Sequence, residues 1–257
     1  MLRVQRYVSD ELTHFVGRSR RNDLEAHYAL FLKIIRGGLL THPPHNPEVS
    51  GNLMVRSDAK ISGNEMYIPQ MVCFCDIPME DLGIHASKYG RFGLAFKKSY
   101  AAGQGASPVF YVAKSSSVWA PRESSEIDPL ALDPRDQIMK RVSRADHFDE
   151  MVSAHHREYQ SMLEQRLEEL VQSGSEPIRV ASRIQRFLAF NLFAYLKFFD
   201  ESKVDDDPDN YYMEREWRVL GNVQFTLEDV ARVILPEEFA ERFRADVPKY
   251  CRQVTFI

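Results

Sequence analysis

Apolar residues recur along the chain in two periods, and each period predicts one type of element. A helical period predicts a helix over residues 22–36, with Asn22 as its cap and Gly37-Gly38 as its end. A second helix is predicted from Pro78 to Tyr89 and a third over residues 236–245. Short apolar or alternating runs predict strands at residues 12–16, 71–75, 92–96, 108–112, 216–220, 231–235 and 253–257.

The middle of the chain has a different pattern. Residues 135–199 are helical in period, with a break at Ser173-Gly174-Ser175, and residues 41–70 form a long irregular stretch. Strands at both ends and helices between them predict an α+β fold with a mixed or antiparallel sheet. We expect one domain over residues 1–257, with residues 135–199 inserted as a helical hairpin whose second helix is the more buried.

Composition narrows the function classes. The chain has 44% apolar and 27% charged residues, as in ordinary globular proteins, and its net charge of −4 argues against bulk nucleic-acid binding. Its three cysteines form neither a disulfide framework nor a zinc array, so we expect no metal and a reducing cytoplasm. No stretch is long and apolar enough to predict a membrane span.

Two acids in the segment 211–218 are the first candidates for chemistry. If the segment is one extended strand, Glu214 and Glu216 point to the same face, together with Tyr212 and Arg218. Acids that gather on one surface are costly unless they are solvated, paired or used in function. The alternatives are a surface ladder of ion pairs and a catalytic carboxylate supported by its neighbour.

The segment 73–90 holds the second group of candidates. On the predicted helix, His85 lies between Asp81 and Tyr89 at intervals of four residues, which makes a polar stripe. A histidine placed in this way either acts as an acid–base group or is a hydrogen-bonded structural residue. On the first strand, His14 precedes the turn that contains Arg18.

Long strings of this sequence resemble the AbiGi proteins, which are linked to abortive infection and phage resistance in bacteria and to an antitoxin role. The strings are YVSDELTHFVGR, LFLKIIRGGLL, VCFCDIPMEDLGIHASKYGRFGLAFKK, PVFYV and NYYMEREWRVLG. They extend from Tyr7 to about Phe239 and so cover most of the chain.

The order of elements is also similar, at the level of the fold, to that of NAD-dependent ADP-ribosyltransferases. This resemblance implies that NAD is the substrate, that His14 contacts its ribose, that Tyr89 stacks on nicotinamide and that Glu216 is catalytic, with Glu214 as the competing acid. Arg18 would meet the pyrophosphate, and His85, Tyr212 and Arg218 would complete the NAD site. We then expect His14, Tyr89 and Glu216 to line one pocket.

Two functions follow from these resemblances. The first is an anti-phage enzyme that transfers ADP-ribose to a macromolecule or hydrolyses NAD. The second is a binding module, an antitoxin or sensor that regulates a toxin or responds to a phage protein. Its contact surface would be the aromatic helix of residues 183–199 with the acidic run of residues 200–210, which holds six acids and one lysine.

Overall fold

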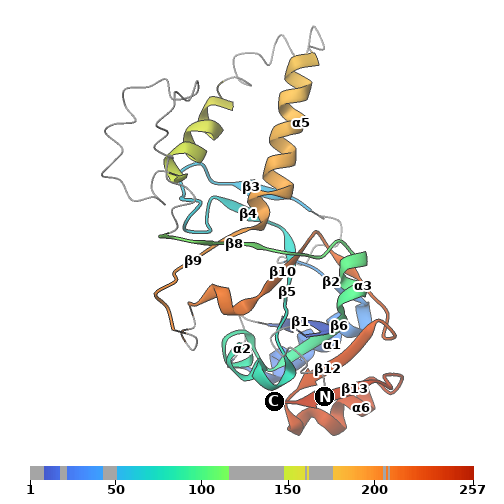
Figure 1. Cartoon of the computed structure of the whole chain (residues 1–257). Coiled ribbons are helices and arrows are strands. Elements are labelled where there is room, and N and C mark those ends of the chain that lie inside the picture. The colour runs from blue at the N-terminus through green and yellow to red at the C-terminus, as the bar shows by residue number, and fades with distance from the viewer. Residues whose placement is uncertain are drawn as a thin grey trace, which may run out of the picture. The chain divides into compact units, whose positions relative to one another are not determined.

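The structure is a computed structural model, and it describes residues 9–17, 22–42, 51–115, 148–159, 161, 176–204, 207 and 209–257 (Figure 1). The chain divides into two compact units. The first draws on residues 1–52, 69–109 and 204–257, and the second on residues 53–68 and 110–203.

The first unit is built on a seven-stranded sheet of the order β13-β12-β6-β1-β5-β10-β7. The strands are β1 (Glu11–Val16), β5 (Met71–Cys75), β6 (Phe92–Lys97), β7 (Ser107–Pro108), β10 (Glu216–Leu220), β12 (Val230–Leu235) and β13 (Gln253–Phe256). Only the pairing of β12 with β13 is parallel, so the sheet is mixed. The predicted α+β class is therefore confirmed, and of the two sheet types expected, mixed or antiparallel, the sheet is mixed.

Helix α1 (Leu24–Gly37) covers one face of this sheet. Tyr28 and Phe31 of α1 are fully buried against Leu12 and Phe92, in a core that joins α1 to β1 and β6. The cap is Asp23 and not the predicted Asn22, because the Asp23 carboxylate accepts a hydrogen bond from the Ala26 amide at 2.9 Å.

The end of α1 is fixed by a left-handed glycine. Gly38 has a φ of 62°, and its carbonyl accepts a hydrogen bond from the Phe225 amide at 2.8 Å. A Cβ at Gly38 would lie 2.4 Å from the Phe225 carbonyl oxygen, whereas a Cβ at Gly37 would meet nothing within 4 Å. This close approach joins α1 to the small sheet of β2 (Leu39–Leu40) and β11 (Val223–Gln224).

The other face of the sheet is covered by a 3-10 turn, η2 (Met79–Asp81), that runs into α2 (Leu82–Tyr89). Leu82 is fully buried against Cys75 and Ile234. The unit is completed by α3 (Lys98–Gly103), η6 (Tyr211–Glu214), η7 (Glu237–Phe239) and α6 (Ala240–Asp246).

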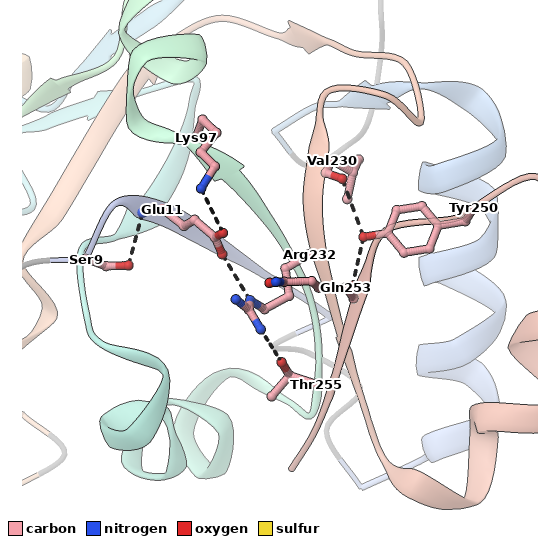
Figure 2. A network of polar contacts seen from close by, with 8 residues as sticks. All are labelled: Ser9, Glu11, Lys97, Val230, Arg232, Tyr250, Gln253 and Thr255. Carbon is pink, nitrogen blue, oxygen red and sulfur yellow. Dashed lines mark hydrogen bonds and ion pairs between the residues drawn. The ribbon is translucent and has the colours of Figure 1, made fainter.

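Polar contacts link four strands of the sheet (Figure 2). The buried carboxylate of Glu11 on β1 accepts hydrogen bonds from Arg232 on β12 at 3.0 Å and from Lys97 on β6 at 3.4 Å. Arg232 donates in turn to the hydroxyl of Thr255 on β13 at 2.9 Å. Glu11 on the first strand is thereby linked through Arg232 to Thr255 on the last strand.

The second unit contains two small sheets, β3 (Leu53–Val55) with β4 (Tyr67–Pro69) and β8 (Phe110–Ala113) with β9 (Leu196–Phe199). It also contains a helix over residues 148–159, the long helix α5 (Glu176–Asn191) and the 3-10 turn η5 (Phe193–Tyr195). Its core surrounds the fully buried Phe198 of β9. The stretch 41–70, predicted to be irregular, thus supplies both β3 and β4.

The prediction of a helix up to Phe199 is wrong. The helix ends at Asn191, and Leu196–Phe199 forms a strand parallel to β8 (Figure 1). The run Leu-Lys-Phe-Phe is short and aromatic, which suits a strand as well as a helix, and the partner strand decides between them. Residues 135–147 and 162–175 of the predicted insertion lie outside the described residues, so the single-domain and insertion boundaries stay predictions.

Candidate functional site

The strand register decides which candidate residues share a face of the main sheet. Thr13 of β1 lies opposite Cys75 of β5, and Cys75 lies opposite Glu216 of β10. Residues directly opposite one another on neighbouring strands point to the same side. Cys75 packs against Leu82 of α2, so Glu216 belongs to the face that α2 covers.

His14 lies on the opposite face. It follows Thr13 and is next to Phe74, with the two ring centroids 5.8 Å apart, and Phe74 belongs to the core beneath α1. The Nδ1 of His14 lies 2.8 Å from the carbonyl oxygen of Cys73. The expectation that His14 and Glu216 line one pocket is therefore not met, because one residue of offset along a strand reverses the side chain.

Glu216 and Arg218 form a buried ion pair on β10. The guanidinium donates from Nε at 2.8 Å and from Nη2 at 3.1 Å to the two carboxylate oxygens. The two side chains are 8% and 9% exposed, and they stand two residues apart on one strand face, as the sequence predicts. A surface ladder is excluded for this pair, because both members are buried.

Glu214 does not lie on the strand with Glu216, which corrects the expectation of a shared strand face. It ends the 3-10 turn η6, and Arg215 after it has a left-handed φ of 42°, so the extended strand β10 begins only at Glu216. Glu214 is buried, and Lys88 of α2 donates to its carboxylate at 2.7 Å. The hydroxyl of Tyr89 donates to the same oxygen.

These contacts place three predicted residues together at the end of α2. Glu214 accepts a hydrogen bond from Tyr89, and the ring of His85 stacks on Tyr89 at a centroid distance of 6.3 Å. Lys88 also lies 4.8 Å from the centre of the Tyr211 ring. We call Lys88, Tyr89, His85 and Glu214 the α2 cluster.

Tyr212, a further candidate, is 53% exposed on η6. Arg18 falls outside the described residues. The residues predicted to bind NAD therefore do not form one site as a set, and the roles assigned to them stay predictions.

Sequence reasoning gave no role to two charged positions, the buried Asp76 and the partly buried Lys88. Asp76, 5% exposed at the end of β5, accepts hydrogen bonds from Lys98 at 2.8 Å and from the Ser9 amide at 2.9 Å. Lys88 received no role from the sequence, although its neighbour Tyr89 did. For Asp76 a signal was present, since an acid directly after a buried strand must find partners.

Burial shifts the pKa of two side chains, His85 on α2 and Cys75 on the sheet face that α2 covers. It lowers the pKa of His85, against a smaller opposing effect of the Glu214 carboxylate. Burial also raises the pKa of the Cys75 thiol, and the charge of Glu214 raises it further. Cys75 is thus held as a thiol, and His85 as a neutral imidazole.

Acidification should therefore destabilise the protein in part through His85. The unfolded chain protonates this histidine at a higher pH than the folded chain does, so stability should fall as the pH drops below about 6.5. Urea unfolding at pH 7.5 and pH 5.0 measures the change. His85→Gln should reduce the difference between the two pH values, and His156, whose pKa burial also lowers, should account for a further part.

If the His85→Gln protein loses as much stability between the two pH values as the parent protein, His85 does not titrate in this way.

Helix α5 of the second unit is less buried than predicted. Val180, Ile184 and Phe187 are 43%, 54% and 58% exposed, and Gln185 and Ala189 are buried among the helix positions whose burial is described. The expectation that this helix is the more buried member of a hairpin is therefore not met for α5. Phe190 and Phe193 are half-buried against the core of the unit.

Within the described ranges, no group of three or more histidine, cysteine or acidic side chains is placed to hold a metal ion. No described helix has the length and apolar content needed to cross a membrane.

Comparison with known proteins supports one of the two resemblances. Residues 57–250 match the family model for AbiGi, described as an abortive phage resistance protein and antitoxin. A curated relative from Lactococcus lactis subsp. cremoris, "Abortive phage resistance protein AbiGi", is 40% identical over 57 residues. That alignment spans 20% of this chain and 22% of the relative.

No solved structure matches the chain, and the comparisons give no support to the resemblance to ADP-ribosyltransferases. The family model covers about three quarters of the sequence, including α2, η6 and β10. The chain belongs to the AbiGi family.

Proposed function

We propose that this chain is the antitoxin of an abortive-infection system, that it acts in the cytoplasm and that it restrains a cognate protein toxin by binding it. The observation that carries the proposal is the AbiGi family match over residues 57–250, since that family is described as an antitoxin. The relative from Lactococcus lactis, which bears the name of an abortive phage resistance protein, supports the same role.

The geometry of the main sheet favours binding over catalysis. The carboxylates predicted to be catalytic are engaged by cations of the chain itself, Glu216 by Arg218 and Glu214 by Lys88. Such buried pairs hold elements in place, here η6 on α2 and the side chains of β10 on one another. An NAD site of the predicted kind would also need His14 and Glu216 on one side of the sheet.

Growth rescue tests the proposal directly. Each other gene of the chain's own abortive-infection locus is induced alone and together with this chain. We expect one gene to arrest growth, this chain to restore it, and the two purified proteins to co-elute as a complex. If no gene of the locus arrests growth, or if growth stays arrested and no complex forms, the antitoxin role is excluded.

A parallel incubation with labelled NAD separates the two readings. The antitoxin proposal expects no release of nicotinamide and no labelled protein. Turnover of NAD that disappears in a well-folded Glu216→Gln protein would instead favour the transferase reading, and the thermal melt of that variant supplies the control for folding.

A further inference from the structure

Helix α5 presents an exposed apolar stripe with regular spacing. Val180, Ile184 and Phe187 stand at positions i, i+4 and i+7, which places them on one side of a helix. All three side chains are at least 43% exposed, although each is apolar. Anchors at this spacing are typical of a helix that inserts one face into a groove of a partner.

A row of arginines runs along one flank of this stripe. Arg179, Arg183 and Arg186 are all exposed, and at 100° per residue they cluster within a 60° sector on the same side of the stripe. The helix has one acid, Glu176, so it carries an excess of positive charge within a chain of net charge −4. On the other flank, Leu188 is uncharged.

The one-sided charge specifies the partner's chemistry. A groove that accepts the stripe would meet three guanidinium groups along one rim, so this rim has to carry carboxylates. A second copy of α5 packed antiparallel would place both arginine rows on the same side of the interface, where like charges repel. An acidic partner protein satisfies both the apolar stripe and the arginine row.

Resting on the proposed antitoxin role, we propose that α5 is the toxin-binding element and that the toxin receives it in an apolar groove with one acidic rim. Phe187, the most exposed of the three apolar side chains, fills the groove. Arg179 and Arg183 orient the helix and accelerate the encounter, since charges at the rim of an interface act mainly on the association rate.

The test measures binding of the toxin identified by growth rescue to purified variants of the full chain. Phe187→Asp should weaken binding by about 30-fold or more, as expected of an interface residue that carries much of the binding energy. Arg179→Glu combined with Arg183→Glu should lower the association rate by about tenfold and reduce its dependence on salt. The conservative pair Arg179→Lys and Arg183→Lys should retain most of the rate.

Two matched controls change exposed residues of the first unit. Arg244→Glu reverses a charge on α6, and Ile84→Asp introduces an acid at an isoleucine of α2 that is 49% exposed. Both should bind the toxin as the parent protein does. Because all the substituted side chains are exposed, thermal melts should agree within a few degrees, which separates binding from folding.

The outcomes separate the two proposals. If the parent protein neither rescues growth nor binds a toxin, the antitoxin role and the α5 assignment are both excluded. If it binds the toxin and the α5 variants bind equally well, the antitoxin role stands and the α5 assignment is overturned. If the α5 variants bind the toxin as the parent protein does but lose binding to vesicles rich in phosphatidylglycerol, α5 is a membrane-binding surface. If the α5 variants bind the toxin as the parent protein does but lose self-association, measured by light scattering, α5 is an interface between copies of this chain.

Discussion

Replacing Arg218 with Met should lower the free energy of unfolding by about 3–5 kcal/mol, which is typical when one partner of a buried ion pair is removed. The guanidinium donates twice to Glu216, and both side chains are less than a tenth exposed. Without it, the carboxylate on the α2 face loses its bidentate partner while it remains buried. Urea unfolding of the purified variant measures the loss.

The double variant Glu216→Leu with Arg218→Met is the decisive control. It removes both charges, so we expect it to be more stable than Arg218→Met alone. A surface comparison is Arg56→Met, whose pair with Asp58 is about half exposed or more on both sides and should contribute about 0–1 kcal/mol. A loss no larger than that of Arg56→Met would show that the pair does not stabilise the fold.

This expectation changes how a functional test of Glu216 must be interpreted. Glu216→Gln leaves Arg218 buried beside a neutral amide, so it lowers stability whatever the chemistry at this position. Loss of phage protection in that variant therefore supports catalysis only when its thermal melt shows that the protein is still folded at the temperature of the assay.

Gly38→Ala should destabilise the protein by about 3 kcal/mol, as the sum of two costs. An alanine at the left-handed φ of 62° costs about 1–2 kcal/mol. The new methyl group would also stand 2.4 Å from the Phe225 carbonyl oxygen, and relieving that overlap costs about 1–3 kcal/mol because backbone has to move. Thermal unfolding followed by circular dichroism measures the effect.

The neighbouring Gly37 is a matched control. It lies inside α1, has no left-handed φ, and its added methyl group would meet nothing within 4 Å. Gly37→Ala should therefore stabilise the protein by about 0.4–1 kcal/mol. Equal effects of the two substitutions would contradict the close approach of α1 to Phe225.

The sequence predicted the elements of the main sheet well because their patterns are local. The strands at β1, β5, β6, β10, β12 and β13 appear as short apolar or alternating runs, and α1 has a clear face and a glycine end. These signals need no knowledge of partner strands.

Predictions that depend on tertiary pairing were less accurate. Leu196–Phe199 is a strand because β8 pairs with it, and the helical period alone does not contain that information. Glu214 lies outside the strand because Arg215, between it and β10, has a left-handed backbone conformation. Such a conformation is uncommon for arginine and was not expected from the sequence.

The candidate site was predicted in part. Spacing correctly put Glu216 and Arg218 on one face, and the polar stripe on α2 brings His85 and Tyr89 near Glu214. The position of His14 could not be derived, because the side of the sheet depends on register against β5 and β6. The partners Lys88 and Asp76 likewise become evident only in three dimensions.

The division of the chain into interleaved segments has a consequence for protein synthesis. Four of the seven strands of the main sheet are made before residue 109, but β10, β12 and β13 follow residue 204. At about 5–20 residues per second, a ribosome needs roughly 5–20 s to make the intervening segment. During that delay the early strands lack the neighbours that pair with them, so the main sheet is completed only when the last part of the chain has been made.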